Sequence, residues 1–250
     1  MDADKVVLVT GGGRGIGAAT ARRAAADGWR VAVNYSANMH AADEVVNGIR
    51  AAGGTALAVQ ADVADEAQVL RMFERIDGEL GRLTGLVNNA GVVAPGAPLA
   101  AHDVARWRRL FDINVIGTLL CAREAVRRMS TARGGAGGGI VNVSSGAARL
   151  GAPGEYVDYA ASKGAVDAFT IGLAKEVAAE GIRVNAVRPG LIDTEIHASG
   201  GRPGRVAQLA HQIPMGRGGA AGEVAEAIVW LLSEQASYTT MSLLDITGAR

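Results

Sequence analysis

The segment between Lys5 and Asp27 constrains the fold more than any other stretch of the chain. A short apolar, β-branched run, Lys5–Thr10, leads directly into a glycine-rich turn at 11–17 and then into an alanine-rich stretch, Ala18–Asp27. These patterns predict a strand, a tight turn and a helix in immediate succession. Glycines allow positive φ angles and let a phosphate approach main-chain amides at a helix N-terminus. A glycine-rich turn alone is weak evidence, but between a first strand and a first helix it predicts a dinucleotide-binding unit.

The alternation of strand and helix patterns continues along the rest of the chain. Hydrophobic residues make up 49% of the 250 residues and aromatic residues only 4%, so the core must consist mainly of Val, Ile, Leu and Ala. This composition suits helices packed on both faces of a buried parallel sheet. We therefore predict one α/β domain, residues 1–250, with a sheet of about seven strands. Further strands are expected at 31–34, 56–60, 83–87, 140–143, 183–187 and 243–246, and helices ending near 52 and 77 and spanning 107–133, 159–180 and 223–232.

Two glycine-rich segments depart from this alternation. Residues 134–139 precede a strand rather than a helix, so they are interpreted as a flexible connector and not as a phosphate cradle. Residues from about Glu195 to Ala221 are polar and only weakly periodic. Such a profile is typical of a mobile lid over a site, and we place this lid at about 191–221.

The distribution of charge argues against nucleic acid and membranes as partners. Lys and Arg balance Asp and Glu, so the formal net charge is zero, and no basic block is present in the sequence. Such a chain lacks the field that an anionic polymer or membrane surface would need. One basic cluster has the spacing of a solvated or subunit-facing side of a helix rather than of a phosphate-backbone site. It consists of Arg123, Arg127, Arg128 and Arg133.

Cysteine and histidine usage predicts neither a disulfide nor a metal site. Cys121 is the single cysteine and lies in an apolar run, so a buried thiol in a reducing compartment is expected. The first residues lack the layout of a signal peptide, and no apolar run reaches membrane-spanning length, so we expect a cytoplasmic protein. The four histidines have no metal-ligand spacing, and no Gly-x-Ser-x-Gly elbow of a serine hydrolase occurs.

Tyr159 and Lys163 lie four residues apart in a helical pattern, and therefore on one helical face. A phenol titrates near pH ~10, and burial alone would raise its pKa further. A cation a few ångströms away favours the phenolate, so we interpret the pair as a tuned proton donor. The alternative is a surface pair that arose by chance.

The residues after the second and third strands would meet the adenosine part of a dinucleotide. The second strand ends in Asn34-Tyr35-Ser36, which contains no carboxylate for the ribose hydroxyls. The third ends in Asp62-Val63, which we expect at the adenine pocket. Asp62 could also be the N-cap of the helix that runs through Asp77, and the two roles are compatible.

Polar residues in the middle of the chain mark further site positions. Asn88-Asn89-Ala90-Gly91 follows the fourth strand, where small residues indicate close backbone approach to a bound group. Asn114 lies inside a helical pattern, where its amide competes with the backbone, so a local kink and a functional role both remain open. Ser144 and Ser145 follow the fifth strand, and the loop after them can fold a hydroxyl back towards Tyr159.

Together, these motifs resemble those of the short-chain dehydrogenase/reductase family in order and spacing, and the likeness spans essentially the whole chain. The residues that carry it are Thr10 to Gly17, Asn88 to Gly91, Asn114, Ser145, Tyr159 to Lys163, and Pro189-Gly190. The resemblance implies a Rossmann-type, doubly wound sheet and hydride transfer between a nicotinamide and a carbonyl carbon without a metal. It also implies catalytic roles: Tyr159 as proton donor or acceptor, Lys163 as ribose anchor and phenol tuner, Ser145 as partner of the carbonyl oxygen, and Asn114 as a water-holding relay.

The resemblance further implies a nicotinamide cofactor and its contacts. NADP(H) is expected over NAD(H), because Tyr35 takes the place of a ribose-binding carboxylate and cannot repel a 2′-phosphate. Ser36 can donate a hydrogen bond to that phosphate and Arg14 can approach it as a cation. The alternative is dual specificity, with Arg14 pointing to solvent. The expected cofactor contacts are Gly11, Gly13, Arg14, Gly15, Ile16, Gly17, Tyr35, Ser36, Asp62, Val63, Asn89, Ala90, Gly91, Tyr159, Lys163, Pro189, Gly190, Ile192 and Thr194.

The motifs do not specify the substrate, which by resemblance is a small carbonyl compound or secondary alcohol. A 3-oxoacyl-carrier-protein reductase and a dinucleotide-binding redox sensor without turnover are alternatives, and the intact catalytic set argues against the sensor. Small apolar residues on several faces of the helices at 107–133 and 159–180 predict pairing between subunits, as in the tetramers common among relatives. Met241 and Ala249 stand where relatives usually have glycine, so we expect local strain if Met241 adopts a positive φ.

Overall fold

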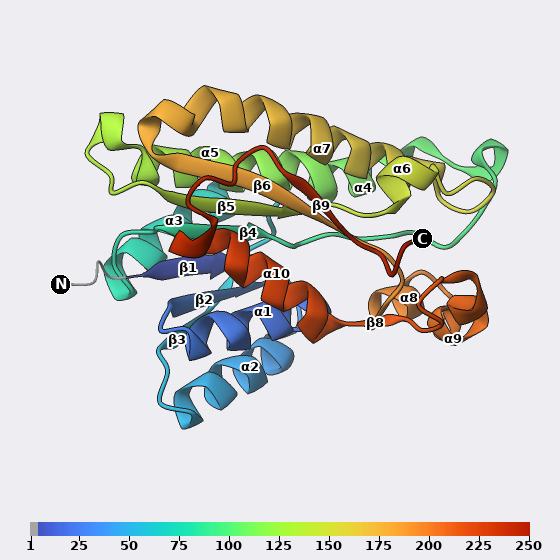
Figure 1. Cartoon of the computed structure of the whole chain (residues 1–250), viewed down its shortest axis with the longest axis horizontal. Coiled ribbons are helices and arrows are strands. Elements are labelled where there is room, and N and C mark those ends of the chain that lie inside the picture. The colour runs from blue at the N-terminus through green and yellow to red at the C-terminus, as the bar shows by residue number, and fades with distance from the viewer. Residues whose placement is uncertain (1–4) are drawn as a thin grey trace.

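Seven parallel strands form the central sheet, in the order β3-β2-β1-β4-β5-β6-β9 (Figure 1). The computed structural model describes residues 5–250; residues 1–4, on which the expectation of no signal peptide partly rests, lie outside the described residues. Every neighbouring pair in the sheet is parallel, so all seven strands end at one edge. The strands span Val6–Val9 (β1), Arg30–Tyr35 (β2), Ala56–Gln60 (β3), Gly85–Asn88 (β4), Gly138–Val143 (β5), Ile182–Pro189 (β6) and Leu243–Ile246 (β9).

Helices cover both faces of this sheet and divide the core into two (Figure 1). Successive strand residues point to opposite faces, so Val6 and Leu8 pack in one core whereas Val7 and Val9 pack in the other. The prediction of one α/β domain with a doubly wound parallel sheet is confirmed. The first core is covered by α3 (Glu66–Glu79), α5 (Gly117–Met129) and α7 (Val157–Val177), and the second by α1 (Gly15–Ala26), α2 (Met39–Ala51) and α10 (Ala221–Leu232).

The helix expected over 107–133 is divided into parts. It begins as α4, Val104–Phe111, passes through a π-helical turn, η2, Asp112–Ile116, and continues as α5. Asn114 lies within η2, so of the two alternatives left open for this residue, the local distortion of the helix is present. Short π-helical insertions of this kind are frequent at functional sites.

The glycine-rich segment 134–139 is only partly a connector. β5 begins at Gly138, earlier than expected from the apolar pattern, and Gly138 has a φ of 148°. A Cβ at this position would overlap the carbonyl oxygen of Thr84. Glycine is therefore required here by close strand packing, and the prediction of a wholly flexible loop is wrong for its last two residues.

The segment expected to be a lid, 191–221, contains short regular elements beyond the edge where the strands end (Figure 1). β7 (Ile192–Asp193) pairs with β8 (Gly219–Ala220), and α8 (Ile196–Ser199), α9 (Arg205–Leu209) and η5 (Ala210–Gln212) lie between them. Helices this short show no clear periodicity in a sequence. The mobility of the segment stays a prediction. The remaining elements are η1 (Leu99–Ala101), η3 (Thr131–Arg133), α6 (Ala147–Leu150), η4 (Ala178–Glu180) and η6 (Glu234–Ala236).

The described part of the chain, residues 5–250, contains no helix that is both long and apolar enough to cross a membrane.

Candidate active site

A cavity of about 870 Å³ lies at the edge where the parallel strands end. This edge is where open α/β sheets bind their ligands, because segments far apart in sequence meet there. Of the predicted site residues, only Gly17 and Asn114 do not line the cavity. Those that line it are Gly11, Gly13, Arg14, Gly15, Ile16, Tyr35, Ser36, Asp62, Val63, Asn89, Ala90, Gly91, Ser145, Tyr159, Lys163, Pro189, Gly190, Ile192 and Thr194.

The glycine turn after β1 provides backbone donors and space for an anion. Gly11 and Gly15 adopt φ angles of 60° and 52°. A Cβ on Gly17 would overlap the carbonyl oxygen of Gly11, so Gly17 permits the tight turn without facing the cavity. Among the described residues, no side chain caps the N-terminus of α1, whose N-cap is Arg14. Its first backbone N–H groups therefore suit a pyrophosphate.

Thr10 and Asn89 fix this turn against the end of β4. Thr10 Oγ1 accepts hydrogen bonds from the backbone N–H groups of Asn89 and Ala90, both at 3.0 Å. Asn89 Nδ2 in turn donates to the carbonyl oxygens of Thr10 and Gly11, at 2.9 and 3.1 Å. The two cavity-lining segments are thus held together by side chains of the residues that follow the strands.

Tyr159 and Lys163 lie together on α7, as their spacing predicted. Lys163 Nζ is 5.7 Å from the centre of the Tyr159 ring and donates a 2.7 Å hydrogen bond to the carbonyl oxygen of Val143. Ser145 follows β5, and its Oγ accepts a hydrogen bond from the N–H of Ala147 at 3.1 Å. The Ser145 hydroxyl also hydrogen-bonds to the Tyr159 phenol and lowers its pKa, so the loop does fold this serine back to the tyrosine.

Burial dominates the pKa values of both residues. It raises the pKa of Tyr159 to about 12, opposed in part by the hydrogen bond with Ser145. It lowers the pKa of Lys163 to about 8, opposed in part by the carboxylate of Asp167. The expected lowering of the phenol pKa is therefore not found in this structure. Lys163 directs its ammonium group to the carbonyl oxygen of Val143, and the desolvation of the phenol outweighs the lowering effect of Ser145.

Comparisons with known proteins assign the family. A family model described as Enoyl-(Acyl carrier protein) reductase matches residues 11–248. The chain is 58% identical over 245 residues to the "Uncharacterized oxidoreductase YgfF" of Escherichia coli (strain K12), covering 98% of this chain and 99% of that protein. A short chain dehydrogenase from Burkholderia cenocepacia J2315, solved in complex with NADP, has a TM-score of 0.89 at 33% identity, with 98% and 97% of the two chains covered. The chain belongs to the short-chain dehydrogenase/reductase family.

This family consists of NAD(P)-dependent oxidoreductases, and a second curated relative has a more specific name. It is the cis-4-hydroxycyclohexanecarboxylate dehydrogenase of Sinomonas cyclohexanicum, 45% identical over 249 residues, with 98% of this chain and 96% of that protein covered.

Within residues 5–250 no group of three or more His, Cys, Asp or Glu side chains could hold a metal ion.

Asn114 of this short-chain dehydrogenase/reductase makes contacts that its position in the sequence did not reveal. Its Oδ1 accepts a 2.8 Å hydrogen bond from the N–H of Val92, and its Nδ2 donates to the Val92 carbonyl oxygen at 3.0 Å and to Ser162 Oγ at 3.1 Å. The side chain therefore clamps the segment after β4 to α7. A Cβ on Gly91 would lie 3.4 Å from Asn114 Oδ1 and 3.5 Å from Lys163 Nζ, so the two residues flank the same glycine.

Asn34 lines the cavity, and sequence reasoning did not assign it to the site. Its Oδ1 accepts a 3.2 Å hydrogen bond from the N–H of Gly11, and its Nδ2 donates to the carbonyl oxygens of Val59 and Ala61 at 3.3 and 3.0 Å. This buried amide joins the ends of β2 and β3 to the glycine turn. An amide at the buried end of an apolar strand was the signal that could have identified it, since a buried polar group needs partners.

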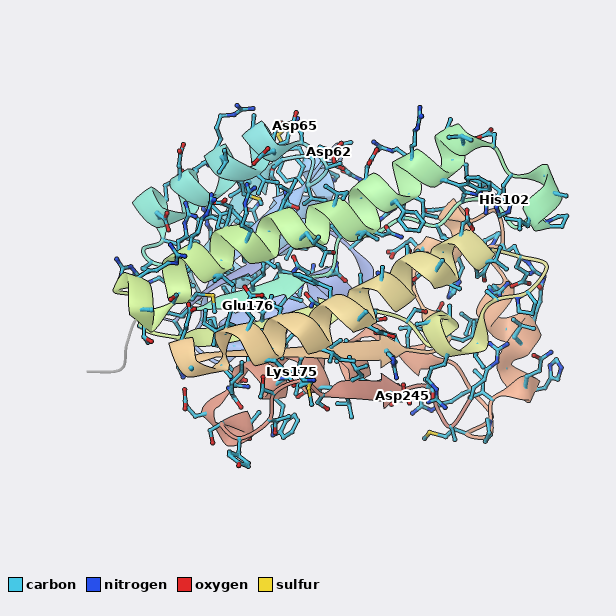
Figure 2. The ribbon with its side chains drawn as sticks, turned by 90° about the horizontal axis from the view of Figure 1, so that it is seen from above. Asp62, Asp65, His102, Lys175, Glu176 and Asp245 are labelled. Carbon is cyan, nitrogen blue, oxygen red and sulfur yellow. The ribbon has the colours of Figure 1, made fainter. Side chains whose placement is uncertain are left out.

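Asp62 lines the cavity at the end of β3, but it does not cap the following helix. Its Oδ1 accepts a 3.0 Å hydrogen bond from the N–H of Ala64, and its Oδ2 lies 3.7 Å from Nη1 of Arg109, another cavity residue that the sequence did not indicate. The N-cap of α3 is Asp65, whose Oδ1 accepts a hydrogen bond from the N–H of Gln68 at 3.1 Å (Figure 2). The N-cap alternative for Asp62 is wrong because α3 begins only at Glu66.

Asp158, directly before Tyr159, anchors the start of α7. Its Oδ2 pairs with Nε of Arg106 at 2.6 Å, while its Oδ1 accepts the Tyr159 N–H at 2.9 Å. His102 lies beside the start of α4 (Figure 2), with Nδ1 3.6 Å from Asp158 Oδ2. The indole N–H of Trp107 can only donate, so its 3.2 Å bond makes His102 Nδ1 an acceptor, and Nε2 carries the proton towards the Ala97 carbonyl oxygen.

Two arginines of the segment 191–221 reach back to the loop before α7. Arg205 places its Nη atoms 2.9 and 2.5 Å from the two carboxylate oxygens of Glu155, and Arg202 bonds to the same carboxylate. The guanidinium of Arg205 also lies 5.1 Å over the ring of Tyr156. All four residues line the cavity. The guanidinium groups, Arg205 first, hold the pKa of Glu155 below its ordinary value, so this carboxylate stays ionised.

Proposed function

We propose that this protein interconverts a small carbonyl compound and the corresponding secondary alcohol with NADP(H), using Tyr159 as general acid and base. The observation that carries the proposal is that one cavity joins the glycine turn to Lys163 and to the half-buried phenol of Tyr159, whose pKa the Ser145 hydroxyl lowers. The names of two relatives, a cis-4-hydroxycyclohexanecarboxylate dehydrogenase at 45% identity and a 3beta-hydroxysteroid dehydrogenase of Eggerthella lenta at 40%, describe hydroxyl-bearing substrates. Both names support an alcohol and carbonyl reaction.

The residues of the chain divide the chemistry among them. Bound NADP(H) supplies or accepts the hydride at nicotinamide C4. Ser145 holds the carbonyl oxygen, and Tyr159 donates a proton to it during reduction or removes one during oxidation. Lys163 anchors the ribose and, as a cation, opposes the burial that raises the phenol pKa. Asn114, which flanks Gly91 together with Lys163, would hold the water that relays protons to the lysine.

The preference for NADP(H) over NAD(H) is proposed from charge at the adenosine end of the cavity. Tyr35 and Ser36 line the cavity at the end of β2, where they present no carboxylate to a 2′-phosphate. Arg14 is exposed and lines the same cavity, so it is free to approach the phosphate. Asp62, the one acid among the predicted cofactor contacts, lies with Oδ2 3.7 Å from Nη1 of Arg109.

A homotetramer is the proposed assembly. The exposed apolar residues Val104, Trp107 and Phe111 follow one another on α4 at helical spacing and form one stripe, with 53%, 36% and 36% of their surfaces exposed. Burial of this stripe between subunits would remove apolar surface from water.

The proposal also covers the cellular compartment of the protein and the movement of the segment 191–221. We place the enzyme in the cytoplasm, because its single cysteine, Cys121, is a free and buried thiol, which suits a reducing compartment. We also propose that the segment 191–221 moves over the cavity, to which it contributes Thr194, His197 and Arg205 among other residues.

A 3-oxoacyl-carrier-protein reductase is the second candidate. The family model carries an acyl-carrier-protein reductase description, and the chain is 35% identical over 248 residues to the 3-oxoacyl-[acyl-carrier-protein] reductase FabG of Staphylococcus aureus (strain Mu50 / ATCC 700699). Assays of NADPH oxidation with 3-oxoacyl thioesters beside small ketones would separate the two candidates.

The substitution Tyr159→Phe tests the proposed function. It removes the hydroxyl and keeps the ring, so cofactor binding should persist while kcat falls by ~10²-fold or more. Tyr238→Phe is the matched control, because this tyrosine is fully exposed and lies outside the cavity. Retention of more than about a tenth of kcat by Tyr159→Phe would refute the acid and base role. If the wild-type protein binds the cofactor but turns over no substrate, this result would favour the redox sensor.

A further inference from the structure

We infer that the substrate carries a carboxylate, and that Arg202 and Arg205 bind it. This inference rests on the proposed function and names the substrate class of the same site. The two arginines belong to the segment 191–221, which supplies one wall of the cavity that contains Tyr159 and Ser145.

The charge of this wall is unbalanced. Two guanidinium groups share the single carboxylate of Glu155, so the group formed by Glu155, Arg202 and Arg205 has a net charge of +1. The other acidic side chains of the cavity, Asp62 and Glu195, do not belong to this group. Asp62 faces Arg109, and Glu195 places Oε2 3.5 Å from where a Cβ of Gly15 would stand. His197 adds no negative charge. Because the group has a net charge of +1, this wall of the cavity would stabilise an anionic ligand.

The group also retains hydrogen-bond donors. Arg205 is 7% exposed, and its Nε is a buried donor for which the described residues provide no acceptor. A buried donor without a partner is costly, so such groups are normally satisfied by protein, water or ligand. Arg202 is more open, with 42% of its side chain exposed, and one Nη1 contact to Glu155 leaves its other N–H groups for a second acceptor. Planar guanidinium groups bind carboxylates through paired N–H donors.

The position of the group relative to the phenol limits the size of the substrate. The Arg205 guanidinium lies over the Tyr156 ring, and the Tyr156 ring meets the Tyr159 ring edge to face, with centres 6.0 Å apart and planes at 88°. A single aromatic ring thus separates the cation from the catalytic tyrosine. A substrate with its carbonyl at Tyr159 and its carboxylate a small ring or short chain away would span the two points.

The test compares two ketones that differ only in charge, 4-oxocyclohexanecarboxylate and its carboxamide. With NADPH, kcat/KM for the carboxylate should exceed that for the carboxamide by about ten- to a hundredfold, the range for charge-assisted hydrogen bonds. Arg202→Gln should reduce this ratio about tenfold. Glu155→Gln should increase it, because the group then has a charge of +2. A general disruption of the lid would instead lower turnover of both ketones and leave the ratio unchanged.

Arg217→Gln is the matched control, since Arg217 lies in the same segment, pairs with Glu223 and does not line the cavity. Its ratio should equal that of the wild type. A wild-type ratio near one, or a ratio that Arg202→Gln leaves unchanged, would overturn the inference. If neither ketone is reduced, the proposed function fails separately, and calorimetric titration of both compounds into the NADP⁺-saturated protein decides the inference. Tighter binding of the carboxylate that is lost in Arg202→Gln supports it, and equal binding overturns it.

Discussion

Arg106 and Asp158 form a bidentate ion pair at the start of the helix that carries Tyr159, with Nε–Oδ2 and Nη2–Oδ1 distances of 2.6 and 3.2 Å. Asp158 is buried, and the same carboxylate accepts the backbone N–H of Tyr159. Arg106 Nη1 also donates to the carbonyl oxygen of Pro95 at 2.6 Å. The pair therefore joins α4, the loop after β4 and the backbone of Tyr159.

The first prediction concerns this pair. Asp158→Asn leaves the guanidinium of Arg106 without its countercharge, which should destabilise the fold by about 3 kcal/mol and also lower kcat by misplacing Tyr159. Chemical denaturation and steady-state kinetics would measure the two effects. Asp103→Asn is the control, because Asn can keep the N-cap contact of Asp103 with the N–H of Arg106. If kcat of Asp158→Asn stays at the wild-type value while stability falls, Asp158 does not position Tyr159.

A second prediction concerns cofactor choice. If Arg14 contacts the 2′-phosphate, kcat/KM with NADPH should exceed that with NADH by about ten- to a hundredfold, and Arg14→Ala should reduce this ratio about tenfold. Arg22→Ala is a suitable control, since Arg22 is exposed on α1 and does not line the cavity. A wild-type ratio at or below one, or a ratio that does not fall in Arg14→Ala, would show dual or NAD(H) specificity.

A third prediction concerns pH and Lys163. Burial lowers the pKa of Lys163 from its ordinary 10.5 to about 8. The unfolded chain therefore binds a proton over a range in which the folded chain does not, so stability should rise with pH between about 8 and 10.5. From pH ~7.5 to ~9.5, the free energy of unfolding should increase by about 2 kcal/mol relative to that of Lys163→Met. Urea unfolding at the two pH values measures it, and parallel changes in both proteins would refute the shift.

A fourth prediction uses the backbone at Met241, which has a φ of 64°, while Ala249 has a φ of 72°. The strain expected where relatives have glycine is thus present in the backbone. Met241→Gly should raise the free energy of unfolding by about 0.5–1 kcal/mol, because relief of a left-handed conformation outweighs the added freedom of the unfolded chain. Met39→Gly is the comparison: Met39 is also exposed but begins α2, where glycine is unfavourable. Loss of stability in both variants would contradict the prediction.

The last prediction concerns assembly. Sedimentation at micromolar concentration should show a particle of four 25.5 kDa chains. Val104→Glu places a charge in the exposed apolar stripe of α4 and should shift the protein to smaller species. Met39→Glu, on a helix over the opposite face of the sheet, should leave the assembly intact. A wild-type protein that sediments only at 25.5 kDa would exclude the tetramer.

The sequence by itself determined the features that depend on near neighbours in the chain. The glycine turn follows from φ angles that only glycine adopts easily, as at Gly11 and Gly15. The strands follow from runs of Val, Ile, Leu and Ala, and Tyr159 and Lys163 share a face because helical spacing is local. The cavity residues were predictable from the family's motifs and because parallel strands bring their ends to one edge, and almost every predicted contact lines the cavity.

The tertiary structure alone decided what depends on partners distant in sequence. The pKa of Tyr159 is raised because desolvation outweighs the lowering effect of Ser145 while the ammonium of Lys163 bonds to Val143, and desolvation is a property of the whole fold. Asn114 lies in the π-helical turn η2, and its side-chain amide hydrogen-bonds to the backbone of Val92. The contacts of Glu155 with Arg202 and Arg205 likewise required the segment 191–221 to fold back on the loop before α7. These pKa values and side-chain contacts depend on desolvation and on partners that are distant in the sequence. A local sequence pattern does not encode either of them.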